Sequence, residues 1–192
     1  MERESICMVH KPDVIVPAED GEFEFAGVKF GILHTPGHSS GHIAIITPDN
    51  VCYVGDAMLS REAQNAKLPY ALHHKAAIDS RRKLLSTRCD YYIMAHTGVC
   101  TGADFPALVR DNDELIHRRA DEILSLVKGS MSFSEINRAV CSYFSLLTRQ
   151  PRRALRFERN VRFFVEYLAD EGYLDMECVD GTVYYKASGK KF

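Results

Sequence analysis

The segment His34-Thr35-Pro36-Gly37-His38-Ser39-Ser40-Gly41-His42 constrains this chain more than any other. Pro36 restricts its own backbone, and Gly37 tolerates backbone angles that are closed to other residues, so the pair predicts a tight turn. Such a turn aims the side chain of His38 in a defined direction. The turn therefore predicts a positioned imidazole between two structural elements.

Short runs of apolar or alternating residues on both sides of this turn predict a β-sheet. Two of these runs are separated by Ala26-Gly27, which predicts a hairpin, and Asp56 follows the last run directly after Gly55. The strands expected from these runs are 14–16, 22–25, 28–33, 43–46 and 51–54.

A helical period replaces the strand pattern after these runs. Residues 74–85 have apolar side chains at helical spacing, and residues 91–94 form another apolar strand that leads to His96. A strand, a helix and a further strand are typical of an α/β domain, in which polar site residues follow strand ends. We assign residues 1–110 to this domain.

Residues 111–192 have the pattern of a second, smaller unit. Three amphipathic helices are expected. The first spans 113–127, the second begins at the capping box formed by Ser132 and Glu135, and the third spans 159–168. Asp180-Gly181 between two alternating runs predicts a hairpin. Helices followed by a hairpin are typical of a small α+β winged-helix domain.

The composition indicates a globular protein without a strongly charged surface. The chain of 192 residues is 46% hydrophobic, and its net charge of −2 argues against strong attraction to nucleic acid or to an anionic membrane. No apolar run is long enough to span a bilayer, and the six cysteines form no C-x-x-C pair. We therefore expect reduced thiols and a cytoplasmic location, with no membrane association.

Three residues at expected strand exits could bind a metal. Neutral imidazoles and carboxylates on rigid strand ends hold zinc, which acidifies a bound water. His38 follows the Pro-Gly turn, Asp56 follows Gly55, and His96 follows the strand 91–94. Each alone would be an ordinary core or surface residue, but three in one α/β unit predict a shared metal site.

These segments resemble the metallo-β-lactamase superfamily, close to its glyoxalase II-like hydrolases. The resemblance rests on the T-P-G-H-x-x-G-H segment, on Gly55-Asp56-Ala57-Met58-Leu59 and on Ala95-His96-Thr97-Gly98, in this order. It implies an αββα fold and a site of two zinc ions, in which His38 binds the first metal, His96 the second, and Asp56 bridges both. It also implies that a metal-bound hydroxide attacks a thioester or ester of a small-molecule substrate. The C-terminal unit resembles the winged-helix extension of many such hydrolases.

One part of the family pattern has no counterpart in this chain. The H-x-H-x-D-H segment, which supplies further ligands to both metals, is missing before the turn. The resemblance therefore implies the C-terminal part of an αββα fold with an incomplete metal site. Since half of such a fold exposes an apolar sheet face, we expect a homo-oligomer or a complementing N-terminal chain.

The resemblance leaves a role for His42 and two further functions open. His42 stands at the second histidine of the turn motif, where a supporting position behind the metal ligands is expected. A non-catalytic chain could act through assembly, with a vestigial half-site. A ribonuclease-like phosphodiesterase could use the arginines between Arg149 and Arg162. From Arg110 onward, however, the chain has fourteen basic and thirteen acidic residues, which argues against nucleic acid as a partner.

Overall fold

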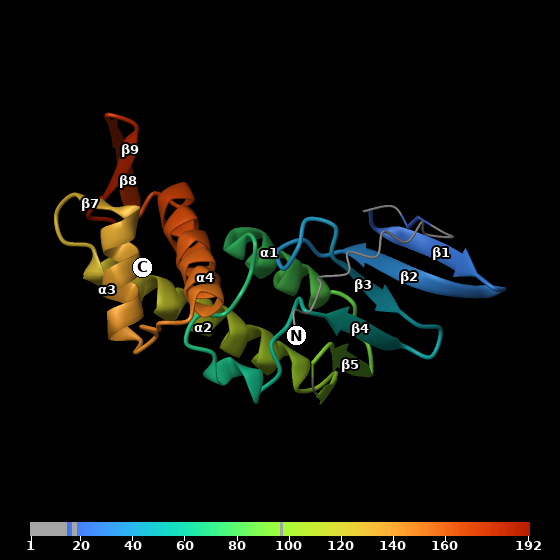
Figure 1. Ribbon diagram of the computed structural model, residues 1–192. Coiled ribbons are helices and arrows are strands. Elements are labelled where there is room, and N and C mark those ends of the chain that lie inside the picture. The colour runs from blue at the N-terminus through green and yellow to red at the C-terminus, as the bar shows by residue number, and fades with distance from the viewer. Residues whose placement is uncertain (1–14, 17–18, 97) are drawn as a thin grey trace, which may run out of the picture.

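A single long helix connects the two parts of the molecule, which the computed structural model describes for residues 15–16, 19–96 and 98–192 (Figure 1). The larger part contains a six-stranded sheet whose strands are β1 (Gly21–Phe25), β2 (Val28–His34), β3 (Ile43–Ile46), β4 (Val51–Gly55), β5 (Tyr91–Met94) and β6 (Val99–Thr101). The strands lie in this order across the sheet, and only the pair β4 and β5 is parallel. The connection between these two strands contains the 3₁₀ turn η1 (Ala63–Asn65) and the helix α1 (His74–Leu84).

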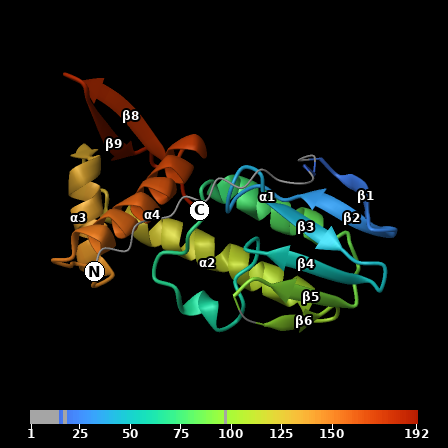
Figure 2. The same ribbon diagram turned by 45° about the vertical axis from the view of Figure 1, so that its right-hand side comes forward.

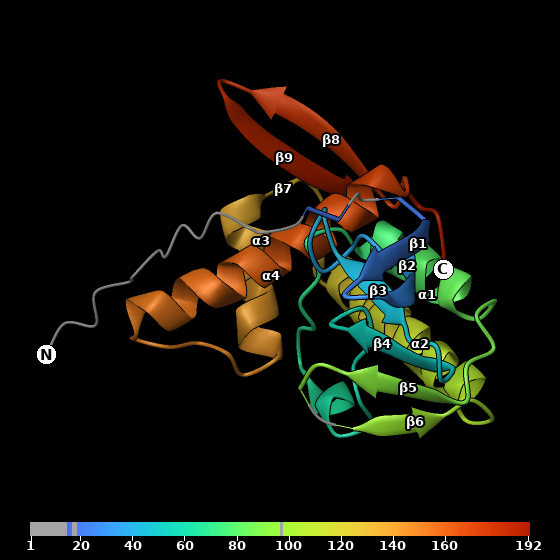
Figure 3. The ribbon, with the colours of Figure 1, turned by 90° about the vertical axis from the view of Figure 1, so that its right-hand side faces the viewer.

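One face of this sheet is buried beneath helices α1 and α2 (Phe105–Leu126), which lie on the same side of it (Figures 2 and 3). Cys52, Tyr92 and Cys100 are neighbours across β4, β5 and β6 and point into this core. The ring of Tyr92 stacks on that of Phe105, with the centroids 3.5 Å apart. The packing of α2 on the sheet thus begins at the first residue of the helix.

The opposite face of the sheet carries apolar side chains that no helix among the described residues covers. Ile45, Tyr53, Ile93 and Val99 are neighbours in register across β3 to β6, on the face opposite to Cys52 and Tyr92. Tyr53 is 42% exposed and Val99 is 66% exposed. We call this row, together with Tyr91, the open face of the sheet.

The smaller part packs three helices around a second apolar core. Its elements besides α2 are β7 (Met131–Ser132), α3 (Phe133–Tyr143), α4 (Pro151–Asp170), β8 (Leu174–Val179) and β9 (Thr182–Ala187), and its sheet has the order β7-β9-β8. The N-terminal turns of α2 contribute Phe105 and Leu108 to the sheet core, and its later turns contribute Ile116 and Ile123 to the second core. Helix α2 is therefore part of both cores.

Most of the expected elements are present, and the differences have local causes. The hairpin turns at Ala26-Gly27 and Asp180-Gly181 form with positive φ at all four residues, and Ser132 and Glu135 make both bonds of a capping box. The helix expected to begin at residue 113 begins at Phe105, so the expected boundary at residue 110 falls inside α2. The helix expected to begin at residue 159 begins at Pro151. In both helices a proline stands in the first turn. A proline there is compatible with a helix, whereas a proline in the interior of a helix interrupts it.

Three further expectations concern strands, thiols and membranes. The expected strand 14–16 includes residue 14, which lies outside the described ranges. Among the cysteines, Cys7 also lies outside them. The five cysteines within those ranges are free, and burial raises the pKa of the Cys52 thiol to about 12. Within the described residues, no helix is both long enough and apolar enough to cross a bilayer.

Candidate metal centre

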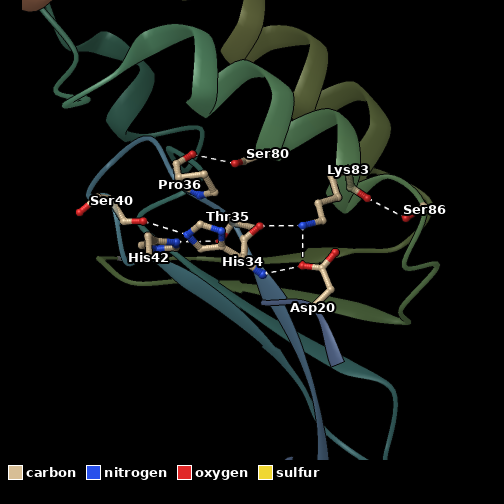
Figure 4. Close-up of polar contacts among 9 residues, drawn as sticks. All are labelled: Asp20, His34, Thr35, Pro36, Ser40, His42, Ser80, Lys83 and Ser86. Atoms are coloured by element: carbon tan, nitrogen blue, oxygen red, sulfur yellow. Dashed lines mark hydrogen bonds and ion pairs between the residues drawn. The ribbon is translucent and has the colours of Figure 1, made fainter. Parts of the chain in front are cut away.

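The Thr-Pro-Gly-His turn packs against helix α1. The carbonyl of Gly37 accepts a hydrogen bond from the backbone N–H of His73 at 3.0 Å, and the hydroxyl of Ser80 donates to the carbonyl of Pro36 at 2.7 Å (Figure 4). Gly37 has a φ of +142°, and a Cβ at this position would lie 2.5 Å from the Cα of Ala77. The turn can approach the helix this closely because residue 37 has no side chain.

A lysine of α1 fixes the strand that leads into the turn. The ammonium of Lys83 donates to the carbonyl of His34 at 2.8 Å and pairs with the carboxylate of Asp20 at 2.5 Å (Figure 4). The same carboxylate accepts a hydrogen bond from the backbone N–H of His34. The hydrogen bond from Lys83, above all, holds the pKa of Asp20 below its usual value. Strand β2 is thus attached to α1 at the point where the turn begins.

His42 connects the turn to the backbone of Asp56. Its Nε2 accepts a hydrogen bond from the N–H of Asp56 at 3.2 Å, so its Nδ1 carries the proton and donates to the hydroxyl of Thr35 at 2.8 Å. Burial, and next the neighbouring His38, lowers the pKa of His42, which favours this neutral form. Both ring nitrogens are therefore engaged inside the protein, and His42 holds Asp56 rather than offering a free nitrogen.

Asp56 depends on the glycine before it for its position. Gly55 ends β4 with a φ of +53°, and a Cβ there would lie 2.9 Å from Nε2 of His42. The N–H of Ala95 donates to the carbonyl of Gly55 at 3.1 Å, which aligns the ends of β4 and β5. The residues that follow these two strands, Asp56 and His96, consequently lie side by side.

The structure brings the three candidate ligands together around one carboxylate. His38 Nε2 is 3.7 Å from Oδ2 of Asp56, and His96 Nε2 is 3.1 Å from Oδ1 of the same residue. The side chains of His38 and Asp56 are 34% and 31% exposed, whereas that of His96 is 84% exposed. Each imidazole thus faces a different oxygen of Asp56, at a surface that solvent and a ligand can reach.

These residues have the chemistry of a zinc site but do not complete one. Imidazole nitrogen and carboxylate oxygen are common zinc ligands, and a carboxylate with an imidazole at each oxygen suits a bridging position. Zinc sites, however, use three or four protein ligands for each ion. Within residues 19–96 and 98–192 no group of three or more histidine, cysteine, aspartate or glutamate side chains has the arrangement of a metal site. Among the described residues these three side chains therefore lie close together without completing a metal site.

Residues of the segment after β4 and of α4 approach this site, although no sequence pattern predicts their contact with it. The ring of Tyr70 packs edge-on against that of His38, with the centroids 4.9 Å apart. The guanidinium of Arg159 lies over the ring of Tyr70, 4.8 Å from its centroid. A tyrosine after Pro69 in an irregular segment has no pattern that predicts this contact; only the packing of α4 creates it.

The adjacent histidines at the start of α1 have opposite environments. His73 is exposed and caps the helix, since its Nδ1 accepts a hydrogen bond from the N–H of Ala76. His74 is 1% exposed and its ring lies 4.0 Å from that of Phe164. Neither ring nitrogen of His74 has a hydrogen-bond partner among the described residues. Burial, and next the cation of Arg81, lowers the pKa of His74 to about 3, so the buried ring is neutral.

A comparison with protein families finds one match in the first half of the chain. Residues 6–96 match the sequence model of the metallo-beta-lactamase superfamily. The matched range includes the turn, Gly55-Asp56 and His96. No curated protein sequence matches the chain.

Solved structures with a similar fold extend over nearly the whole chain. A metallo-beta-lactamase family protein from Thermus thermophilus superposes with a TM-score of 0.67 at 23% identity, over 92% of this chain and 56% of its own. A beta-lactamase domain protein from Burkholderia ambifaria gives a TM-score of 0.68 at 16% identity, over 93% of this chain and 53% of its own. The chain therefore spans about half the length of these two structures, and its sheet and helices have the fold of the corresponding part.

Proposed function

We propose, from the premise that residues 6–96 carry a metallo-beta-lactamase superfamily domain, that this protein supplies part of the site of a metal-dependent hydrolase. The observation that carries the proposal is the placement of His38 and His96 at opposite oxygens of Asp56. In the complete site His38 would hold a first zinc ion, His96 would hold a second, and Asp56 would be shared between them. His42 supports this arrangement by holding the backbone of Asp56.

The resemblance to the family implies a small-molecule thioester or ester as the substrate class. Bound zinc supplies a water of lowered pKa and stabilises the negative charge that develops during hydrolysis. The side chains of His38 and Asp56 are 34% and 31% exposed, so a small-molecule substrate can reach them. Tyr70 packs on one side of His38 and restricts its ring, so it positions this ligand.

The remaining ligands of the site have to come from residues other than those described here. One imidazole and one shared carboxylate oxygen at each ion fall short of the three or four ligands that zinc requires. A second copy of the chain or a complementing N-terminal chain would supply the imidazoles that the half-site lacks. The open face of the sheet is where such a partner would pack.

Metal titration tests the proposal directly. Cobalt(II), which reports its ligands by visible absorption, is added to the metal-free protein and to the variants Asp56→Asn and Asp121→Asn. The proposal expects an absorption spectrum of nitrogen and oxygen ligation that zinc abolishes, loss of the spectrum in Asp56→Asn, and no change in Asp121→Asn, because Asp121 is exposed on α2. An Asp56→Asn protein that binds cobalt as the unchanged chain does would refute the bridging role.

A non-catalytic role in assembly is the first alternative, and the incomplete donor set favours it. In this case the half-site is vestigial and the C-terminal unit mediates contacts between chains. The protein would then carry no stoichiometric metal after purification, and a chelator would leave its thermal stability unchanged. About two zinc ions per chain by elemental analysis would exclude this alternative.

A ribonuclease-like phosphodiesterase is the second alternative, and the arginines of α4 favour it. Arg152, Arg153, Arg156, Arg159 and Arg162 have no carboxylate within 4 Å among the described residues. Binding of RNA through such residues would weaken steeply with salt, because each phosphate contact releases a counterion. Equal affinity for RNA across a salt series would remove this alternative.

The division of the chain and its location complete the proposal. We assign residues 1–110 to the hydrolase domain and 111–192 to a winged-helix domain with α2 as the linker, on the support of the helices α3 and α4 and the hairpin β8–β9. The five free cysteines support a cytoplasmic location, because disulfides are rare in that compartment.

A further inference from the structure

A cavity of about 280 Å³ lies between the start of helix α4 and two segments that pack beside it. It is separate from the candidate metal centre, since none of His38, Asp56 and His96 lines it. We call it the α4 cavity and define it by six of its lining residues. These residues are Lys67, Leu146, Arg153, Arg156, Phe157 and Asn160.

Three cations and no acidic residue line the α4 cavity. Lys67 is held in place because its ammonium donates to the carbonyl of Phe144 at 2.7 Å, which leaves two of its three protons for another acceptor. Arg153 lies over the ring of Phe157, with its Cζ 5.5 Å from the centroid. Among the described residues, no carboxylate lies within 4 Å of Lys67, Arg153 or Arg156. The cavity thus concentrates positive charge that no ion pair within the described part of the chain neutralises.

The position of the two arginines on α4 adds to this excess of charge. The N-terminus of a helix carries a partial positive charge, so cations there reduce stability and anions increase it. Helix α4 begins at Pro151 and has no acidic residue in its first turn, whereas Arg153 and Arg156 lie within its first two turns. An anion bound in the cavity would relieve both the repulsion between the arginines and their unfavourable position on the helix.

Asn160 provides an independent sign of a ligand. Its side-chain amide donates from Nδ2 to the carbonyl of Leu68 at 3.1 Å, and the residue is only 8% exposed. Its Oδ1 is buried and has no hydrogen-bond partner among the described residues. A buried acceptor without a donor costs free energy that a hydroxyl group of a ligand would recover.

We propose that the α4 cavity binds a small organic phosphate that carries a hydroxyl group, of the class of the sugar phosphates. Arg153, Arg156 and Lys67 bind the phosphate, for which arginine offers paired donors in the geometry of the phosphate oxygens. Asn160 Oδ1 accepts a hydrogen bond from the hydroxyl, and Leu146 and Phe157 contact the carbon skeleton. The site does not depend on the proposed hydrolase activity, because it shares no residue with the candidate metal centre.

Isothermal titration calorimetry with three probes tests the site and separates its parts. Ribose 5-phosphate, inorganic phosphate and ribose are titrated into the full chain. Ribose 5-phosphate is expected to bind with one site per chain, inorganic phosphate about tenfold more weakly, and ribose not measurably, because the charged hydrogen bonds supply most of the affinity. Equal affinity for ribose 5-phosphate and inorganic phosphate would overturn the role of Asn160, and binding of neither would overturn the site.

Substitutions on the same helix provide the matched control. Arg153→Gln and Arg156→Gln should each weaken the binding of ribose 5-phosphate about tenfold, whereas Arg152→Gln should leave it unchanged, because Arg152 does not line the cavity. The two cavity variants should melt at the same temperature as the unchanged chain or higher, since each removes a cation from the positive end of α4. Similar losses of affinity in all three variants would show a diffuse electrostatic effect and overturn the proposed site.

Discussion

Single residues decide how the side chains of the candidate metal centre are aimed. Gly37 permits the contact between the turn and α1, and Gly55 permits the contact between β4 and His42. In both cases the absence of a side chain allows a backbone to approach a neighbour that any Cβ would meet. The direction of His38 and Asp56 is therefore set by the glycine that precedes each of them.

Replacement of Gly37 tests the first of these contacts. Gly37→Ala should lower the free energy of unfolding by about 3 kcal/mol, because its Cβ would collide with Ala77 and its φ of +142° is unfavourable for alanine. Urea denaturation measures the loss. The control is Gly41→Ala in the same turn, where a Cβ would meet nothing within 4 Å. Equal stability of the two variants would show that the turn does not depend on its contact with α1.

His74 makes a testable contribution to the pH dependence of stability. Its pKa of about 3 in the folded protein lies below the ordinary value of 6.5, so the unfolded chain binds a proton more readily than the folded one. Its stabilising effect is complete above pH 6.5 and decreases, by about 1.4 kcal/mol per pH unit, as the pH falls from 6.5 towards 3.

Denaturation of the unchanged chain and of His74→Phe at about pH 5 and about pH 7.5 measures this contribution. The two pH values lie about one to two units on either side of the pKa of histidine in the unfolded chain. The phenylalanine keeps a ring against Phe164 but cannot bind a proton. The variant should lose about 2 kcal/mol less than the unchanged chain between these two pH values. The same decrease in both proteins would assign the pH dependence to other groups.

Among the secondary-structure elements, α2 links the loop after Asp56 to the rest of the fold. Asn112, which is 2% exposed, donates from Nδ2 to the carbonyls of Leu59 and Leu108 and accepts at Oδ1 from the N–H of Leu59. Asn112 thereby attaches this loop to α2 at Leu59, three residues after the loop begins at Asp56. The position of Asp56 thus depends on α2 as well as on β4.

Removal of this amide tests the attachment. Asn112→Leu should cost about 2 to 4 kcal/mol, because it leaves both backbone groups of Leu59 without their partners in a partly buried place. The measurement is the free energy of unfolding in urea, with Glu114→Gln on the exposed side of α2 as the control. A loss below about 1 kcal/mol, the net value of one ordinary hydrogen bond, would mean that water replaces the amide.

At the same scale, local patterns predict some elements better than others. The hairpins at Ala26-Gly27 and Asp180-Gly181 and the capping box at Ser132 follow from short-range chemistry, and the structure confirms them. Strand β6 has only three residues, too few for a periodic pattern, and its pairing with β5 depends on contacts across the sheet. The candidate ligands could be found because each follows a recognisable turn or strand end. The contact of Tyr70 with His38 and Arg159 could not, since it joins segments that are far apart in the sequence.

In the molecule as a whole, the two faces of the larger sheet differ in what covers them. Helices α1 and α2 cover one face, whereas Tyr53, Tyr91 and Val99 are 42%, 50% and 66% exposed on the other (Figure 3). A contiguous apolar surface of this kind favours association, because burying it removes the surface from water. The expected homo-oligomer or complementing chain would therefore use the open face.

Light scattering coupled to size-exclusion chromatography tests this expectation. The unchanged chain should elute as an oligomer, and Tyr53→Lys combined with Val99→Lys should shift it to the monomer. Leu155→Lys is the control, because Leu155 is 64% exposed on α4, outside the sheet. A monodisperse monomer of the unchanged chain that melts in one cooperative transition would contradict the proposed association.

The sharing of α2 between the two cores has a consequence for synthesis on the ribosome. Helix α1 covers part of the buried face of the sheet, but the cover from α2 comes only from Phe105 onward, after all six strands have been made. Until that helix emerges, the nascent sheet lacks most of its cover and is open to holding chaperones or to misassembly. The later turns of the same helix then offer Ile116 and Ile123 as the first surface on which the C-terminal unit can condense. The order of translation thus makes α2 the last piece of one folding unit and the first piece of the next.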